Sequence, residues 1–240
     1  MKYVQVCKDA LPVAQQKIWD SFSAVKKLGF TLYGGTALAL YLGHRMSVDF
    51  NFFSDRPLDS SMEQKLHEVM PFLASAEVLQ REQNTRTYFT RDKVKISFFG
   101  GIPFGRVGDP VLTDDGVMQL ASLHDLFATK LAVISQRIEY KDYFDIVSLL
   151  RYGISLKEGM AGAIALYREN FLPQDTLKIL CYFEGGDLNC LTSEDKEFLV
   201  SICRNFSLCE ITPMPISSFA LSAFEPDDNP VAEPEMGSSI

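Results

Sequence analysis

Residues 30–53, FTLYGGTALALYLGHRMSVDFNFF, decide the fold. An apolar β-type run leads into a Gly-Gly pair, an apolar helical run follows, and a second β-type run closes the stretch. Asp49 and Asn51 stand two residues apart on the second run, so they point to one face of a strand. Phe50 and Phe52 point to the other face. The segment therefore predicts a strand–turn–helix–strand unit with one polar face and one core face.

Residues 34–36, Gly-Gly-Thr, have the composition of a phosphate-holding turn. Glycines let backbone N–H groups approach an anion closely, and the N-terminus of the next helix adds a partial positive charge. The Thr36 hydroxyl would add a donor, and Arg45, beside Ser47 in the following link, has the planar donor fork that suits phosphate. Two plain alternatives stay open, because a Gly-Gly turn is a common tight connection and Arg45 could pair with Asp49.

Asp49 is the candidate metal ligand. A carboxylate on a strand soon after a phosphate-holding turn can bind Mg²⁺, which bridges phosphate oxygens. Asn51 offers a neutral oxygen, which coordinates a hard cation more weakly than a carboxylate does. Judged from these residues alone, it is equally well supported that Asp49 and Asn51 simply form the polar face of a strand at the edge of a sheet.

A second group of candidates lies in residues 125–150, DLFATKLAVISQRIEYKDYFDIVSLL. Lys130 is surrounded by apolar residues of a predicted helix, and Arg137 follows about two turns later. Such a lysine either runs along the edge of a core or reaches into a cleft. Asp142 and Asp145 share one helix face, and by itself such a charged face is expected to be solvated.

The remaining pattern predicts an α+β chain in three parts. These are an α/β core at 1–120, a helical part at 121–209 packed against it, and an acidic, Pro- and Ser-rich tail at 210–240 that is solvated or loosely docked. Predicted helices span about 10–28, 36–42, 60–71, 122–137, 141–152, 156–170, 174–183 and 193–206; predicted strands span 30–33, 48–53, 77–80, 85–91, 94–99 and 116–120.

Composition narrows the class of protein. The 240 residues are 47% apolar, which is typical of a globular chain, and the net charge is −8. The tail contributes −6 of that charge, so residues 1–209 are nearly neutral and lack the broad basic surface of proteins that bind long nucleic acids. No apolar run approaches the roughly 20 residues of a membrane span, and the five cysteines form no C-x-x-C pair. We expect a cytoplasmic protein without a membrane segment.

In combination, these residues resemble the AbiEii/AbiGii toxin family of nucleotidyltransferases. The family pattern is a Gly-Gly-Thr/Ser turn, an apolar helix, H-R-x-S-x-D-x-D-F-F, a Lys-bearing helix and a K/R-D-x-x-D helix. The chain has GGTALAL at 34–40, HRMSVDFNFF at 44–53, TKLAVISQR at 129–137 and KDYFDI at 141–146. The resemblance covers about residues 25–185.

The resemblance implies a polymerase-β-type nucleotidyltransferase, with a mixed sheet, flanking helices and a helical C-terminal part that completes the active-site cleft. It implies transfer of a nucleoside monophosphate from a nucleoside triphosphate to an acceptor hydroxyl, with Mg²⁺ as cofactor and RNA, tRNA above all, as acceptor. It also implies a toxin of a toxin–antitoxin or phage-defence system, with an antitoxin protein as partner.

The site residues that the resemblance implies fall into three groups. The catalytic group is Asp49, Asn51, Lys130 and Asp142, with Asp145 as a secondary candidate; the phosphate-binding group is Gly34, Gly35, Thr36, Arg45, Ser47 and Arg137; the metal ligands are Asp49 and Asn51.

Two departures from the family pattern leave alternatives open. Asn51 stands where the family has its second Asp, and Ser97 stands where polymerase-β-like enzymes carry a third carboxylate. Weak metal binding and slow, altered or absent activity are expected from these changes. One alternative is a nucleotide-binding or partner-binding protein that keeps the fold without the chemistry. Another is an enzyme that makes short oligonucleotides or modifies a protein.

Overall fold

Residues 30–53 form the predicted unit in the computed structural model, which describes residues 2–224. Strand β2 (Thr31–Tyr33) leads into helix α2 (Gly34–Leu42), and β3 (Asp49–Phe53) returns antiparallel beside β2. Helix α2 begins two residues earlier than expected, so the glycine pair forms its first turn. Gly34 has a φ of 76°, in the left-handed region that glycine adopts at little cost.

The predicted mixed sheet is confirmed. Within residues 2–224 it has eight strands in the order β1-β7-β8-β2-β3-β6-β5-β4, with β3 parallel to β6 and antiparallel to β2. The other strands are β1 (Tyr3–Val4), β4 (Glu77–Glu82), β5 (Thr85–Phe89), β6 (Lys95–Phe99), β7 (Val111–Thr113) and β8 (Gln119–Leu120). Strands β1 and β7 were not predicted, because two or three residues are too few to show an alternating pattern.

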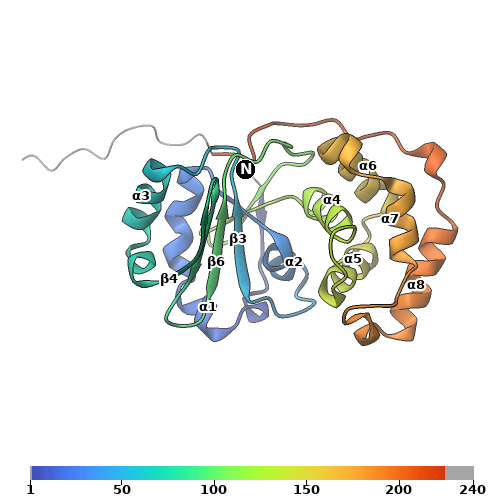
Figure 1. The fold of residues 1–240 in the computed structure, drawn as a ribbon, viewed down its shortest axis with the longest axis horizontal. Helices are drawn as coiled ribbons and strands as arrows, with labels where there is room; N and C mark the ends of the chain where they lie inside the picture. The colour runs from blue at the N-terminus through green and yellow to red at the C-terminus, as the bar shows by residue number, and fades with distance from the viewer. Residues whose placement is uncertain (1, 225–240) are drawn as a thin grey trace, which may run out of the picture.

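Helices cover both faces of the sheet (Figure 1). Helix α3 lies on one side, and α2 with the helical part, α4 to α8, lies on the other. The remaining helices are α1 (Val13–Lys17), α3 (Ser60–Val69), α4 (Leu123–Val133), α5 (Tyr140–Tyr152), α6 (Leu156–Tyr167), α7 (Pro173–Leu180) and α8 (Ser193–Arg204), with 3₁₀ helices η1 (Lys8–Ala10), η2 (Trp19–Leu28), η3 (Pro71–Ser75), η4 (Arg168–Asn170), η5 (Leu188–Cys190) and η6 (Leu208–Glu210). None of the helices in the described chain has both the length and the apolar content to cross a membrane.

The expected helix at 10–28 is instead the short helix α1 followed by η2. Trp19, Phe22 and Val25 are all buried and stand three residues apart. Residues three apart lie on one face of a 3₁₀ helix, because residues i and i+3 eclipse one another there. They also lie on one face of an α-helix, so this spacing fits both helix types. The apolar pattern therefore located the buried face correctly but did not specify the helix type.

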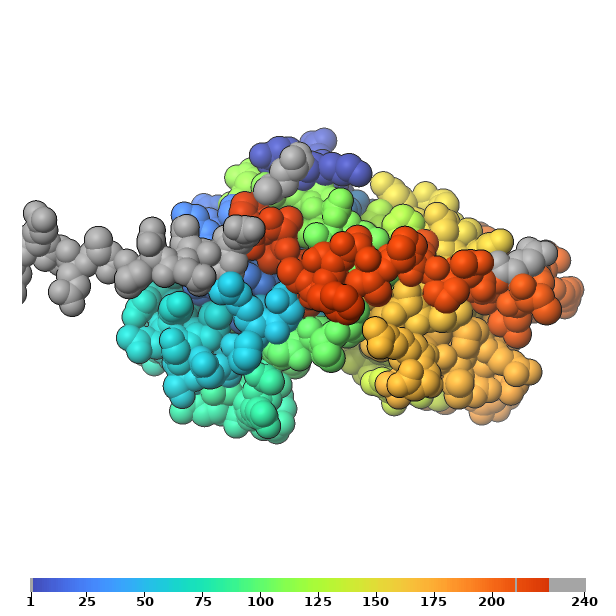
Figure 2. Space-filling model, turned by 90° about the horizontal axis from the view of Figure 1, so that it is seen from above, coloured from blue at the N-terminus to red at the C-terminus, as the bar shows by residue number. Residues whose placement is uncertain are grey.

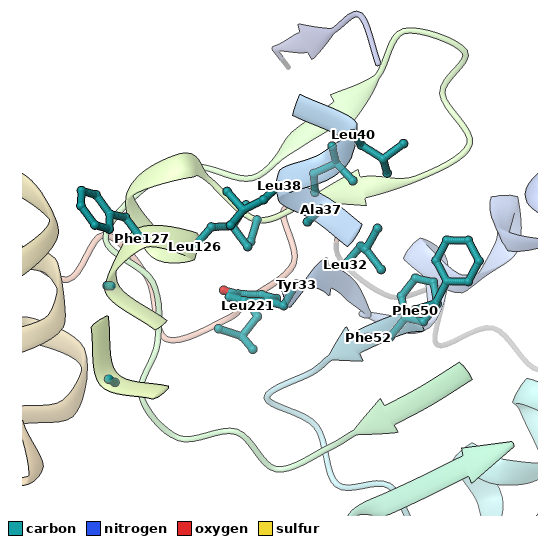
Figure 3. Close-up of a cluster of buried hydrophobic side chains, with 14 of the residues drawn as sticks. Leu32, Tyr33, Ala37, Leu38, Leu40, Phe50, Phe52, Leu126, Phe127 and Leu221 are labelled. Carbon is teal, nitrogen blue, oxygen red and sulfur yellow. The ribbon is translucent and has the colours of Figure 1, made fainter. Parts of the chain in front are cut away.

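One hydrophobic core extends from the sheet into the helical part (Figure 3). Phe50 and Phe52 of β3 are buried, which confirms the two-faced strand, and Leu38 of α2 and Leu126 of α4 belong to the same cluster. The proposed division at residue 120 falls between β8 and α4, and this core runs across it.

Residues 211–224 return from the helical part to the sheet (Figures 1 and 2). The Met214 amide donates to a carbonyl of α6, and the Leu221 amide donates to Asp55 Oδ1 at 2.8 Å. The Leu221 side chain is fully buried. A solvated or loosely docked tail was expected from residue 210 onward; the segment 211–224 is largely exposed but is anchored at both ends, and residues 225–240 lie outside the described chain.

Candidate active site

A cavity of about 790 Å³ is lined by the α2–β3 connection, by strands β3 to β6, and by residues of α4, α5 and the link between them. Of the predicted site residues, Gly35, Arg45, Ser47, Asp49, Asn51, Lys130 and Arg137 line it. The two motif groups, about 80 residues apart in the sequence, thus meet at one cavity. A volume of this size is typical of small-molecule sites.

The sheet side of the cavity presents two carboxylates, Asp49 on β3 and Glu82 on β4, and a row of neutral side chains on β3, β6 and β5. In the parallel pairing of β3 with β6, Asp49 lies beside Lys95 and Asn51 lies beside Ser97. The next strand places Thr87 beside Ser97, with 3.1 Å between their hydroxyl oxygens. The floor of the cavity therefore offers an amide and two hydroxyls where a metal-binding floor would carry carboxylates.

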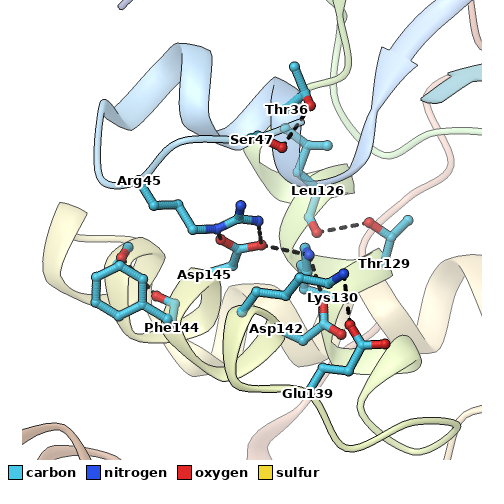
Figure 4. A network of polar contacts seen from close by, with 12 residues as sticks. Thr36, Arg45, Ser47, Leu126, Thr129, Lys130, Glu139, Asp142, Phe144 and Asp145 are labelled. Atoms are coloured by element: carbon cyan, nitrogen blue, oxygen red, sulfur yellow. Dashed lines mark hydrogen bonds and ion pairs between the residues drawn. The ribbon is translucent and has the colours of Figure 1, made fainter. Parts of the chain in front are cut away.

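Cations from both sides of the cavity are fixed by two buried carboxylates of helix α5 (Figure 4). Lys130 Nζ lies 2.7 Å from Asp142 Oδ1 and 2.6 Å from Asp145 Oδ2. Arg45 donates to Asp145 through Nε at 2.6 Å and Nη2 at 2.8 Å, and Arg137 Nε donates to Asp142 at 2.8 Å. His44 Nε2 lies 2.7 Å from Asp145 Oδ1. The carboxylates hold the cations at the cavity without facing it themselves.

Both carboxylates are ionised at neutral pH. Burial opposes ionisation of Asp145, but the hydrogen bonds from Arg45 and His44 and the charge of Lys130 outweigh it and bring its pKa well below the usual range. Burial likewise opposes ionisation of Asp142, and the hydrogen bond from Arg137 with the charge of Lys130 lowers its pKa. The hydrogen bond to Asp142 raises the pKa of Arg137. Arg45 and Arg137, whose pKa values are raised, therefore keep their charge.

These contacts correct two expectations. The face of Asp142 and Asp145 is not solvated, because both side chains are fully buried. Arg45 binds Asp145 rather than Asp49. Lys130 was expected either to run along the edge of the core or to reach into a cleft. It reaches into the cleft, because it lines the cavity although only 6% of the residue is exposed.

The glycine turn is packed against the site. A Cβ on Gly35 would overlap Nη2 of Arg45, and a Cβ on Gly34 would lie 3.2 Å from Nδ2 of Asn51. Gly35 lines the cavity, while Gly34 lies against Asn51. Close approach of the helix α2 backbone to these side chains is what requires glycine here.

Thr36 lies beneath the cavity. Its side chain is fully buried, and its hydroxyl donates to the Asp49 carbonyl and lies 2.8 Å from the Ser47 hydroxyl. Thr36 therefore positions β3 and Ser47; it is not the phosphate donor that was expected. Ser47 itself lines the cavity.

The donor set fits one Mg²⁺ ion. Among the described residues no group of three or more His, Cys, Asp or Glu side chains could hold a metal. Asp49 supplies one carboxylate, and Asn51, Ser97 and Thr87 supply neutral oxygens. Mg²⁺ is commonly held by one or two carboxylates together with substrate phosphates and water. These residues therefore suit an ion that arrives with a triphosphate, and they do not suit a two-ion clamp.

The sequence patterns missed part of the site. Lys95 and Thr87 reach it only through strand pairing, which local patterns do not reveal. Met46, Val48 and Leu79 line the cavity although they are 60%, 60% and 50% exposed. Exposed apolar groups beside cations suit a ligand that has both a charged end and a flat apolar face, as a nucleotide has.

Comparison with known proteins agrees with this geometry. A family model described as "Nucleotidyl transferase AbiEii toxin, Type IV TA system" matches residues 20–196. An uncharacterized protein of Aquifex aeolicus (strain VF5) is 33% identical over 161 residues, which are 65% of this chain and 75% of that protein. The family match spans both motif groups and every residue that lines the cavity. The chain therefore belongs to the AbiEii family of nucleotidyl transferase toxins of type IV toxin–antitoxin systems.

Proposed function

We propose that the protein is a Mg²⁺-dependent nucleotidyltransferase that moves a nucleoside monophosphate from a nucleoside triphosphate to an acceptor hydroxyl of RNA, tRNA above all. The observation that carries this proposal is the array of Arg45, Lys130 and Arg137, held at one cavity by buried Asp142 and Asp145 and facing Asp49. The proposed site residues are those predicted from the sequence, with Thr36 and Asp142 as positioning residues.

Charge supports a triphosphate as the ligand. Five cationic side chains line the cavity, against the two carboxylates of Asp49 and Glu82. Asp142 and Asp145 orient three of the five before any ligand binds. Charges fixed in this way stabilise a transition state without the cost of reorganising at the moment of reaction.

The proposed reaction is an in-line transfer at the α-phosphorus. The acceptor hydroxyl oxygen forms a bond to that phosphorus while the bond to the bridging oxygen of the β-phosphate breaks, pyrophosphate leaves, and the hydroxyl proton passes to solvent. Lys130, Arg45 and Arg137 bind the phosphate oxygens and stabilise the charge that develops on the leaving group. Mg²⁺, when bound by Asp49 and Asn51, would further offset charge on the phosphate oxygens.

The protein would bind the RNA acceptor only over a short stretch near its reacting end. Residues 1–209 carry a net charge of only −2, so an extended electrostatic footprint on RNA is not supported. The exposed side chains of Met46, Val48 and Leu79 provide an apolar rim for the flat face of a base near the reacting end. This arrangement fits addition to the end of a strand.

Family membership supports a toxin that a partner antitoxin counters. Expression of the protein alone is then expected to slow growth of the host cell, and coexpression of the gene beside it is expected to restore growth. Inactivation of the site should abolish the growth defect without loss of the folded protein.

The test is transfer of radiolabel from each of the four α-labelled nucleoside triphosphates to total RNA, with Mg²⁺ present. Asp49→Ala and Lys130→Met should each reduce transfer at least about 100-fold, as expected when charge stabilisation is lost. Asn51→Asp should raise transfer, because it adds a carboxylate beside Asp49. Lys65→Ala, an exposed lysine on α3, serves as the matched control. No transfer by the wild type and by Asn51→Asp would overturn the proposal.

A second candidate is a protein that binds nucleotide without transferring it. The neutral row of Asn51, Ser97 and Thr87 favours it, because the floor holds no carboxylate besides Asp49 at the register of those strands. Calorimetry that shows triphosphate binding in the absence of any labelled product would select this candidate.

A further inference from the structure

We infer that the ammonium group of Lys95 takes the place of a second metal ion in the cavity and binds the triphosphate beside a single divalent cation. The inference rests on the proposed function, since it concerns how the same cavity holds its nucleotide. Lys95 lies outside the family motif segments 34–40, 44–53, 129–137 and 141–146.

The sheet register puts Lys95 in place. Lys95 lies directly beside Asp49 across the parallel pair of β6 and β3, and both side chains line the cavity. Ser97, two residues further along β6, occupies the same face beside Asn51. A cation therefore stands next to the carboxylate, and neutral groups stand where further metal ligands would be needed.

Lys95 differs from the other cations of the cavity in how it is held. Arg45 and Lys130 bind fully buried Asp145 at 2.6 Å, and Lys141 lies 2.8 Å from Glu139. Lys95 Nζ lies 3.8 Å from Asp49 Oδ2, which is too long for a hydrogen bond. Its side chain is 43% exposed, so the flexible stem can carry the ammonium group to a ligand. The contact with Asp49 is weak enough to give way to a phosphate.

The positive charge of Lys95 can replace the charge that a second metal ion would supply. A two-ion site stabilises both the attacking and the leaving oxygens with a pair of cations about 3.5–4 Å apart. The single carboxylate of Asp49 can hold one such ion with the help of phosphate oxygens. Lys95 adds a second positive centre at the same place, and a lysine ammonium is an effective point charge for phosphate. The site thereby reaches a similar local charge without a second ion.

If Lys95 binds the triphosphate directly, part of the affinity of the protein for phosphate groups does not depend on a metal ion. Wild-type protein should bind inorganic tripolyphosphate in the presence of EDTA, as measured by calorimetry. Lys95→Ala should weaken that binding at least about tenfold, Lys95→Arg should retain most of it, and Lys65→Ala should leave it unchanged. Circular dichroism should show the same fold for all four proteins, because Lys65 is exposed and the side chain of Lys95 is 43% exposed.

Metal stoichiometry provides the second measurement. Electron paramagnetic resonance of Mn²⁺ titrated into the protein with ATP should show one bound ion per chain, both in the wild type and in Lys95→Ala. Two bound ions in the wild type would overturn the inference. So would tripolyphosphate binding that is absent in the wild type or unaltered in Lys95→Ala.

The two proposals fail separately. If no nucleotide is transferred but both binding results are obtained, the proposed function is wrong and the role of Lys95 in binding stands. If transfer is observed with two Mn²⁺ ions bound, the proposed function stands and the inference about Lys95 is wrong.

Discussion

Arg45 and Asp145 form a two-point ion pair, with Nε to Oδ1 at 2.6 Å and Nη2 to Oδ2 at 2.8 Å. The pair joins the link after helix α2 to helix α5, so it connects the sheet side of the cavity to the helical side. The Asp145 side chain is fully buried and also accepts from Lys130. The same carboxylate therefore serves both the stability of the fold and the placement of the cations.

Asp145→Asn should destabilise the protein by about 3–5 kcal/mol, because it leaves partly buried Arg45 and buried Lys130 short of a counter-charge. Urea unfolding followed by circular dichroism measures the change. The matched control is Asp175→Asn, in an exposed pair with Lys178, which should change the free energy of unfolding by less than about 1 kcal/mol. Equal effects of the two substitutions would show that the Asp145 cluster does not stabilise the fold.

Stability should fall steeply in acid. The pKa values of Asp142 and Asp145 are lower in the folded protein than in the unfolded chain, where an aspartate titrates near about 3.9. Their contribution is therefore fully present above about pH 4 to 5 and is lost as the pH falls toward the folded pKa values. Urea midpoints measured from pH 7 to pH 3 should decrease in the acidic part of the range. A flat profile down to pH 3 would contradict this coupling.

Gly35→Ala should weaken nucleotide binding at least about tenfold and should also lower stability. The added Cβ would overlap Nη2 of Arg45 and displace this side chain from the cavity, which disturbs its ion pair with fully buried Asp145. Calorimetry with ATP gives the affinity, and thermal unfolding gives the stability. Unchanged affinity would mean that Arg45 does not contact the nucleotide.

Thr36→Val should lower both stability and transfer. The substitution removes the hydroxyl that bonds the Asp49 carbonyl and Ser47, and leaves those groups short of a partner in a buried site. A loss of about 1–3 kcal/mol is expected from unfolding measurements. Thr36→Ser keeps the hydroxyl and is expected to retain transfer; if the two variants behave alike, the hydroxyl does not position β3.

The sequence predicted the strand–turn–helix–strand unit of residues 30–53 because its signals are local. The alternation of Asp49 and Asn51 with two phenylalanines fixes which side chains face the core, and the structure agrees. The order of strands, turn and helix in residues 30–53 likewise follows from neighbouring residues. Family motifs then identified Lys130 and Asp142 as residues that approach this unit.

Burial and register could not be predicted in the same way. Two aspartates three residues apart look solvated in isolation, and only the tertiary contacts of Asp142 and Asp145 with cations on other segments make their burial favourable. Lys95 belongs to the site because β6 pairs with β3 in one register; a shift by one residue would turn it to the opposite face. Thr36 has a plausible motif role, yet its hydroxyl is used within the fold.

The segment 211–224 restricts relative motion of the sheet and the helical part. The chain crosses between the sheet and the helical part once before α4 and again through this segment, where Leu221 is buried and its amide binds Asp55. A hinge motion that separated the two sides would have to break this anchor as well as the Arg45–Asp145 pair. These two contacts therefore limit how far the sheet and the helical part can move apart.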